Sequence, residues 1–117
     1  MKQDFITYQL YIRLTEDTTI EAGKLGAVYL RKGLYIYTGS AKKNMAARIK
    51  RHRRKDKKRH WHIDHITTLP QAHIEKVTYH IEDECFINKK TVGTILAPGF
   101  GASDCKNGCV SHLKFIG

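Results

Sequence analysis

Hydrophobic and polar residues in the first forty positions follow the two-residue period of β-strands. The segment 5–14 is rich in β-branched and aromatic residues, which predicts one strand. The segment 27–39 predicts a short strand, a turn around Lys32 and Gly33, and a second strand. Residues 15–26 are acidic and interrupted by glycine, so we expect a loop or a long hairpin connection there. The N-terminal third therefore predicts three antiparallel strands.

The period changes to that of a helix after residue 40. Asn44 is a suitable N-cap, and residues 45–57 contain no glycine or proline, so they predict one helix. Met45 and Ile49 are four residues apart and mark the side of this helix that we expect to be buried.

The basic residues of this helix fall into two groups. On a helical wheel, Arg48 and His52 flank the buried side and point toward the sheet. Lys50, Arg51 and Arg54 point outward, where they can contact phosphate groups. An arginine that faces a sheet is unusual unless it has a partner, so Arg48 is a candidate for chemistry.

The rest of the chain predicts two further helices and two further strands. Residues 60–69 predict a short helix ended by Pro70, and residues 73–83 predict a fourth strand. Residues 84–95 predict a helix with acidic residues in its first turn, and residues 110–117 predict a closing strand. This order predicts one small α+β domain over the whole chain, with helices against a mainly antiparallel sheet.

The positive charge of the chain is concentrated in one stretch. The net charge is +10, and residues 42–59 hold eleven of the 21 Lys and Arg, with Asp56 as their only acid. Such a focused field suits a polyanion, and nucleic acid is the commonest one in the cytosol. A solvated helix and loop that keep the protein soluble is the alternative. The candidate phosphate-binding residues are Lys42, Lys43, Lys50, Arg51, Arg54, Lys55, Lys57, Lys58 and Arg59.

Composition also bounds the compartment in which the protein is expected to work. Apolar residues make up 41% of the chain, enough for a modest core. No apolar run approaches the roughly 20 residues that cross a bilayer. The N-terminal segment lacks the long apolar stretch of a signal peptide, so we expect a cytoplasmic protein with no membrane partner.

The cysteines form an odd set of three, which makes disulfides a poor default in a reducing compartment. Cys105, Cys109 and His112 form a candidate zinc cluster. Cys85 or a histidine of residues 60–65 would have to complete it, because structural zinc takes four ligands. Buried, unreactive cysteines are the alternative, and the glycine-rich loop around them is equally suited to form a wall of a substrate groove.

A tyrosine on the strand before the basic helix raises the question of phosphodiester chemistry. Hydrolysis needs a base for the attacking water, positive charge on the phosphate and usually a divalent metal held by a carboxylate. A tyrosine serves as the base when cations and hydrogen bonds lower its pKa well below about 10. Tyr37, followed by the inward-facing Arg48, has such a neighbourhood, although strand tyrosines are more often core or rim residues.

The motifs resemble those of a known superfamily. The sequence YTGS at 37–40, a helix with Arg48 four residues before His52, and ITY at 6–8 look like the GIY-YIG nuclease superfamily. The fuller pattern GLYIYTGSA…RIKRH…KRHWHIDHI…EC…PGFGASDC…SHL is similar to one small branch of it. Some members of that branch are joined to DNA glycosylases of the endonuclease III type. The resemblance covers nearly the whole chain.

The resemblance implies a fold and a set of roles. The fold is a central three-stranded antiparallel sheet flanked by helices, with an extra C-terminal strand here. Tyr8 and Tyr37 would lie side by side, one as general base and the other orienting water. Arg48 would stabilise charge on the scissile phosphate, and His52 would support a tyrosine or contact the phosphate. Glu84 would hold one Mg²⁺ or Mn²⁺.

The segment HWHIDH at 60–65 offers three readings. The resemblance suggests that His60 or His62 lines the active site, and we prefer His62. Trp61 and His65 simply pack on the sheet in the second reading. In the third the histidines bind zinc, although their spacing matches no standard ligand pattern.

The chain departs from the superfamily pattern in both motifs. Ile6 replaces the glycine of the first motif, and Thr7 replaces its isoleucine. Thr38 replaces the isoleucine of the second motif. We expect these exchanges to leave the fold intact and to affect the fine geometry of strand entry.

These observations favour a metal-dependent endonuclease that hydrolyses DNA phosphodiester bonds, in repair or structure-selective processing. We expect DNA as the substrate, with RNA as the alternative. Specificity would come from DNA shape, a flap, a nick or a DNA-repair partner protein, and we expect a monomer or weak dimer. The rival hypotheses are a nucleic-acid-binding module without catalysis and a zinc-stabilised interaction protein.

Overall fold

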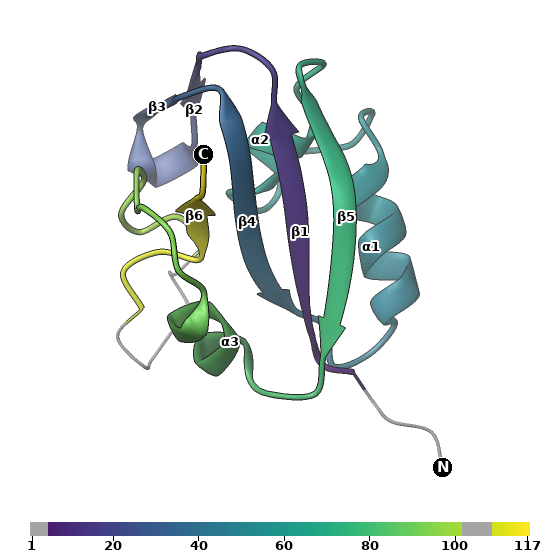
Figure 1. Ribbon diagram of the computed structural model, residues 1–117. Helices are drawn as coiled ribbons and strands as arrows, with labels where there is room; N and C mark the ends of the chain where they lie inside the picture. Colours follow the sequence, from purple (N-terminus) through teal and green to yellow (C-terminus); the bar gives the residue numbers. More distant parts are fainter. Residues whose placement is uncertain (1–4, 102–108) are drawn as a thin grey trace.

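The computed structural model describes residues 5–101 and 109–117, which form an antiparallel sheet, a separate hairpin and α-helices (Figure 1). The strand order of the sheet is β5-β1-β4-β6. Its strands are β1 (Thr7–Leu14), β4 (Gly33–Ser40), β5 (Ala72–His80) and β6 (Leu113–Phe115). The hairpin consists of β2 (Thr18–Glu21) and β3 (Ala27–Leu30), joined through the 3-10 helix η1 (Gly23–Leu25). The helices are α1 (Met45–Arg53), α2 (Asp64–Thr67) and α3 (Glu84–Lys90).

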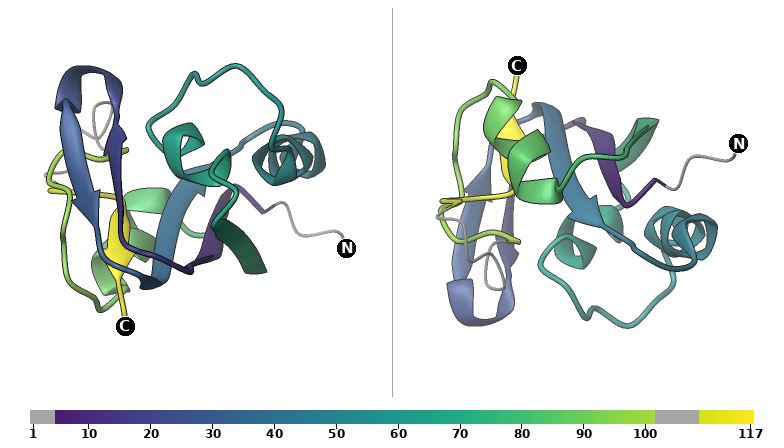
Figure 2. Two further views of the ribbon diagram at one scale, coloured as in Figure 1. Left: turned by 90° about the horizontal axis from the view of Figure 1, so that it is seen from above. Right: turned by 90° about the horizontal axis from the view of Figure 1, so that it is seen from below.

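Helices α1 and α2 cover one side of the sheet, and α3 lies on the other side (Figure 2). The alternation along β1 accounts for this arrangement. The even-numbered residues of β1, from Tyr8 to Leu14, are all buried and belong to the main hydrophobic cluster together with Ile49 of α1 and Ile66 of α2. Gln9 points to the opposite side, where its Nε2 donates to Oγ1 of Thr91 at 2.7 Å, directly after α3.

The pairing of β1 with β4 brings the two tyrosines of the sequence motifs onto one face. Tyr8 is opposite Gly39, and Leu10 is opposite Tyr37. Since side chains alternate along a strand, Tyr8 and Tyr37 project toward the side of α1, and their ring centroids are 6.4 Å apart.

The expected fold class is confirmed. The central strands β5, β1 and β4 are antiparallel, and the C-terminal strand β6 adds to the edge of β4. The prediction was wrong for the early strands, because Thr18–Glu21 forms β2 within a segment expected to be a loop. Its partner β3 therefore joins the hairpin instead of the central sheet.

The predicted helices are longer than the observed ones. Helix α1 ends at Arg53, since Arg54 is extended with φ −77° and ψ 130°. Asn44 precedes α1 as predicted, but it has a left-handed φ of 56° and makes no side-chain cap hydrogen bond. Helix α3 ends at Lys90, five residues before the expected end. In the described part of the chain, no helix combines the length and apolar character needed to span a bilayer.

Candidate functional site

A polar pocket of about 210 Å³ opens at the end of the sheet where β4 finishes and β1 begins. The right view in Figure 2, seen from below, looks toward this end, with α3 on one side of the sheet and α1 on the other. Its lining draws on distant parts of the sequence: Tyr8, Tyr37, Gly39, Ser40, Arg48, His60, Trp61, His62, Glu84, Gly101 and His112. Four of the five predicted catalytic residues and the predicted metal ligand therefore meet in one pocket.

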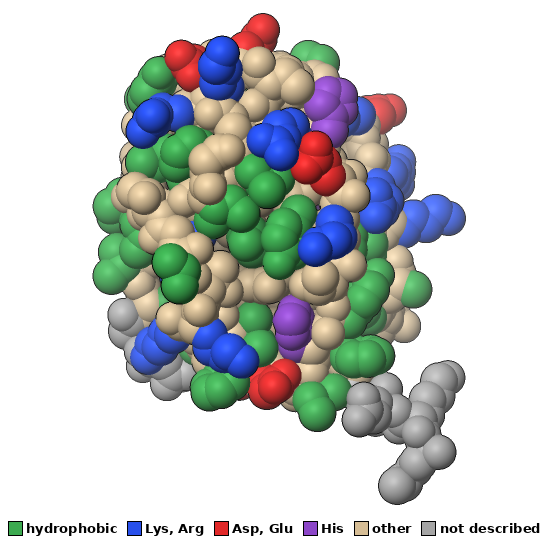
Figure 3. Space-filling view, in the orientation of Figure 1, with side chains coloured by type: hydrophobic (Ala, Val, Ile, Leu, Met, Phe, Trp, Pro, Cys, Tyr) green, Lys and Arg blue, Asp and Glu red, His purple; other side chains and the backbone are tan. Residues whose placement is uncertain are grey.

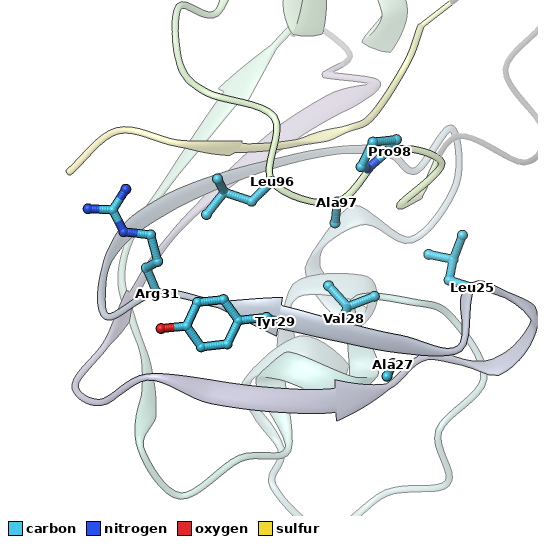
Figure 4. A pocket seen from close by; sticks show the side chains of 8 residues that line it. All are labelled: Leu25, Ala27, Val28, Tyr29, Arg31, Leu96, Ala97 and Pro98. Atoms are coloured by element: carbon cyan, nitrogen blue, oxygen red, sulfur yellow. The ribbon is translucent and has the colours of Figure 1, made fainter.

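A larger hollow of about 370 Å³ lies between β3 and the segment 96–98 (Figure 4). Most of its lining is aliphatic, with Tyr29 and Arg31 at one end and Leu25 at the other. Its lining, as far as the structure describes the chain, includes no carboxylate, histidine or cysteine. The smaller, polar pocket is therefore the better candidate for chemistry, despite its size.

Tyr8 is held in place by His52 and Gly39. Its hydroxyl oxygen lies 2.6 Å from Nε2 of His52, which is buried on α1. A Cβ atom added at Gly39 would lie only 2.5 Å from the same oxygen and 2.6 Å from Cζ of Tyr8. The glycine of the second motif is thus required because the phenol ring lies directly over its backbone. His52 supports Tyr8 from behind and is absent from the pocket lining.

The expected lowering of a tyrosine pKa is not observed. Burial raises the pKa of Tyr8 to about 12, although the nearby Arg48 acts in the opposite direction. Burial also raises the pKa of Tyr37 well above its ordinary value, with smaller contributions from Tyr8 and Glu84. Desolvation exceeds the effect of the arginine, so both phenols are neutral in the protein at pH 7.

His52 is neutral as well. Burial, and secondarily the ammonium group of Lys57, lower its pKa to about 3. The contact between Tyr8 and His52 is therefore a hydrogen bond between two uncharged groups at neutral pH.

Arg48 faces the sheet, as its helical position predicted. Its Nη1 donates to the carbonyl of Ser40 at 3.1 Å, and its guanidinium carbon lies 4.5 Å from the centre of the Trp61 ring. These contacts orient a permanent positive charge toward the pocket, close enough to Tyr8 to influence its pKa. Arg48 is placed to bind an anion.

His62 has a defined tautomer in its neutral form. The backbone N–H of Gly101 donates to Nδ1 of His62 at 2.9 Å. Nδ1 must therefore carry the lone pair, and the proton resides on Nε2. A histidine of this kind at a pocket wall can donate a hydrogen bond to an anion. His60 lines the same pocket, so both histidines that the sequence offered as lining residues are found there.

Among the lining residues that the structure describes, Glu84 supplies the only carboxylate. It is the first residue of α3, directly after Asp83, which accepts the N–H of Cys85 as the helix cap. Its Oε1 accepts a hydrogen bond from Oγ of Ser40 at 3.2 Å, and its Oε2 lies 3.4 Å from Nδ1 of His112. Mg²⁺ and Mn²⁺ bind through one or two carboxylates plus water and substrate phosphate, so a single partly exposed glutamate fits such an ion.

Arg51 does not point outward, which corrects the helical-wheel prediction. Its guanidinium forms two hydrogen bonds with the carboxylate of Asp64, at 2.9 and 3.0 Å. Asp64 is fully buried and also accepts the backbone N–H groups of His60 and Trp61 at 2.8 and 2.9 Å. This ion pair therefore fixes the turn that presents Trp61 and His62 to the pocket.

Lys55 and Lys57 are also engaged within the protein. Lys57 donates to the carbonyls of Arg51 and His52 at 2.9 and 3.1 Å, and burial lowers its pKa to about 8. Lys55 donates to the carbonyls of Leu69 and Ala72. Both residues are better placed to hold the loop after α1 than to bind phosphate.

The other predicted phosphate-binding residues are exposed: Lys42, Lys43, Lys50, Arg54, Lys58 and Arg59. They belong to α1 and the segments on either side of it. Over the face shown in Figure 3, Lys and Arg side chains are dispersed among hydrophobic and acidic ones. The concentration of basic residues in the sequence thus lies on the side of α1.

The cysteine cluster is only partly described. Cys105 lies outside the described residues. Cys85, Cys109 and His112 offer ligand atoms that all lie within 4.8 Å of one another. The sequence suggested Cys85 only as one residue that could complete the zinc cluster. In the structure it is one of the three described residues that form the cluster.

Residues 7–117 match the family described as Domain of unknown function DUF123. The chain belongs to the DUF123 family. Comparisons with curated proteins and with solved structures find no match. The DUF123 match includes every residue that lines the polar pocket, so the pocket is formed entirely by the family's domain.

The lining of the DUF123 pocket also includes residues that were not predicted as parts of the active site: Gly39, Ser40, Trp61, Gly101 and His112. Ser40 contacts both Glu84 and Arg48, and Gly101 fixes His62. His112 was predicted only as a zinc ligand, yet its ring reaches Glu84. Gly101 belongs to the glycine-rich loop that the sequence suggested as a wall of a substrate groove. The contacts of His112 with the pocket come from distant segments, so local spacing carried no signal for them. Ser40 at least adjoined the second motif.

Proposed function

We propose that this DUF123 chain is a divalent-metal-dependent endonuclease of the GIY-YIG type that hydrolyses DNA phosphodiester bonds in the cytoplasm. The observation that carries the proposal is the meeting of Tyr8, Tyr37, Arg48 and Glu84 in one pocket. These residues come from β1, β4, α1 and α3.

The proposed binding step rests on hydrogen-bond donors. Arg48 and the Nε2–H of His62 would hold the nonbridging oxygens of the scissile phosphate, where negative charge increases in the transition state. A divalent ion at Glu84 would supply positive charge to the phosphate and to the leaving oxygen. Ser40 orients Glu84 for this purpose through its hydroxyl group.

The proposed proton transfer uses the neutral Tyr8–His52 pair. A phenol with a pKa of about 12 is almost never ionised at pH 7, so Tyr8 cannot act as a preformed phenolate. It accepts a proton from the attacking water while its own proton passes to Nε2 of His52, 2.6 Å away. The negative charge of a bound phosphate favours the resulting imidazolium. Tyr37 would orient the water.

Exposed basic residues around α1 would hold the flanking backbone, a contact that weakens as salt rises. The proposed context is repair or processing of DNA with a flap or nick, acting alone or with a repair protein. RNA presents the same phosphate groups and is included in the test for that reason.

The direct test is cleavage of nicked, flapped and single-stranded DNA, and matched RNA, by the full chain with Mg²⁺ or Mn²⁺. We expect metal-dependent cleavage that falls at least about 100-fold in Tyr8→Phe and Arg48→Ala. Tyr11→Phe is the matched control, because Tyr11 lies on the opposite sheet face beside Lys76. Binding without cleavage on every substrate and with both metals would favour the rival hypothesis of a non-catalytic nucleic-acid-binding module.

A further inference from the structure

We propose that Cys85, Cys109 and His112 form a zinc site that ties the C-terminal segment to α3 beside the polar pocket. The candidate ligand atoms lie within 4.8 Å of one another. Zinc bonds of about 2.3 Å to sulfur and 2.0–2.1 Å to nitrogen in tetrahedral geometry separate ligand atoms by about 3.4–3.8 Å. Shifts on the order of 1 Å would therefore bring the three groups into coordination distance.

The orientation of His112 gives an independent reason for a metal. Its Nδ1 lies 3.1 Å from the carbonyl oxygen of Thr38 in a buried setting. A carbonyl oxygen only accepts, so the proton resides on Nδ1, and Nε2 carries the lone pair that a metal requires. Metal-binding histidines typically donate their other N–H to a carbonyl or a carboxylate in this way. Oε2 of Glu84, 3.4 Å from the same Nδ1, adds to this support.

The chemistry of the ligands selects the metal. Two thiolates and one imidazole suit zinc, whereas Mg²⁺ and Mn²⁺ prefer oxygen ligands. Lys114, whose ammonium group is held by the carbonyls of Asn88 and Thr91, is close enough to Cys109 for their charges to interact. Two thiolates neutralise the charge of the dication, so the ammonium does not oppose binding.

Burial indicates a structural site with a route for entry. Cys85 is buried in the first turn of α3, whereas Cys109 is partly exposed. A closed structural site takes a fourth donor beside these three protein ligands. The C-terminal segment joins the sheet through the three-residue strand β6, adjoining backbone contacts and the contact of the His112 ring with Thr38. Zinc would therefore hold α3, and with it Glu84, against the end of the sheet.

The inference is independent of nuclease activity, because a zinc site would fasten the fold whether or not the pocket hydrolyses DNA. Its test measures metal content in the full chain purified without added zinc. We expect about one zinc per chain, and a more than 10-fold loss of zinc affinity in Cys109→Ser and His112→Gln. His73→Gln is the matched control, since His73 is exposed on β5.

A second measurement guards against variants that fail to fold. Co²⁺ added to the metal-free wild-type chain should produce a thiolate-to-cobalt charge-transfer band, which Cys85→Ser weakens. Zinc should also raise the unfolding midpoint of the metal-free wild type. A wild-type chain that binds neither Zn²⁺ nor Co²⁺ above background would overturn the proposal. If that chain still cleaves DNA with Mg²⁺, the zinc proposal fails and the nuclease proposal stands.

Discussion

Tyr8 illustrates how one side chain can be fixed by two neighbours of opposite kind. Gly39 makes room for its ring by lacking a Cβ atom, and His52 holds its hydroxyl at 2.6 Å. Burial then keeps both Tyr8 and His52 uncharged at neutral pH. The consequence is a neutral phenol that forms a hydrogen bond with a neutral imidazole.

Gly39→Ala should disable cleavage while leaving the chain folded. Its new Cβ would lie 2.5 Å from the hydroxyl oxygen of Tyr8, so the ring must move away from the position in which the proposed mechanism needs it. We expect at least a 10-fold loss of cleavage rate and a destabilisation of about 1–3 kcal/mol, measured by urea unfolding. In a Tyr8→Ala background the same exchange should cost less stability, because the ring is gone. Equal costs in both backgrounds would show that Tyr8 is not the group displaced.

The free energy of unfolding should depend on pH through His52. Its pKa is about 3 in the folded chain and about 6.5 when unfolded, so between these values only the unfolded chain binds the proton. Stability is therefore complete above pH 6.5 and falls as pH decreases toward 3, by at most about 1.4 kcal/mol per unit. Urea unfolding from pH 7 to 4.5 should show a shallower pH slope in His52→Gln and an unchanged slope in His73→Gln. Identical slopes in all three proteins would contradict the buried neutral imidazole.

The turn before α2 depends on an ion pair between elements. Arg51 of α1 meets the buried Asp64, the first residue of α2, and Asp64 in turn binds the backbone of the turn. Asp64→Asn should cost about 3–5 kcal/mol, because it leaves the guanidinium without its carboxylate. Glu75→Gln, which removes the exposed pair with Arg13, is the control and should cost less than about 1 kcal/mol. Similar losses in the two variants would deny Asp64 this role.

Sequence patterns predicted the elements better than their contacts. Alternation identified β1 and β4, and helical spacing placed Arg48 toward the sheet, because these signals are local. The predicted direction of the Arg51 side chain was wrong because its partner Asp64 is thirteen residues away. A helical wheel represents positions within one helix and carries no information about partners outside it. Strand β2 was missed because its polar sequence becomes a strand only by pairing with β3. The superfamily resemblance, not periodicity, brought Tyr8 and Glu84 into the candidate site.

At the scale of the whole molecule, the charges on the side of α1 should govern nucleic-acid binding. The triple variant of Lys42, Lys43 and Lys50 to Ala removes three exposed cations there. We expect weaker DNA binding and a slope of log K against log salt that is smaller by up to about 2.7, since each phosphate contact contributes about 0.9.

A charge-matched control distinguishes a located surface from net charge. Changing Lys24, Arg31 and Lys32 to Ala removes the same charge at the hairpin, where all three are exposed. This variant should keep most of the affinity and nearly the full salt slope. Equal losses in the two triple variants would mean that binding follows net charge alone.

The central claim is that the polar pocket is a hydrolytic site built around the carboxylate of Glu84. Its most direct test is the single-turnover cleavage rate of a labelled flap DNA in excess Mn²⁺, compared for the wild type, Glu84→Gln and Glu82→Gln. Glu82 is an exposed acid two residues away and outside the pocket lining. The account predicts a loss of at least about 100-fold in Glu84→Gln and a rate within about twofold of wild type in Glu82→Gln. Wild-type cleavage by Glu84→Gln, or equal losses in both variants, would contradict it.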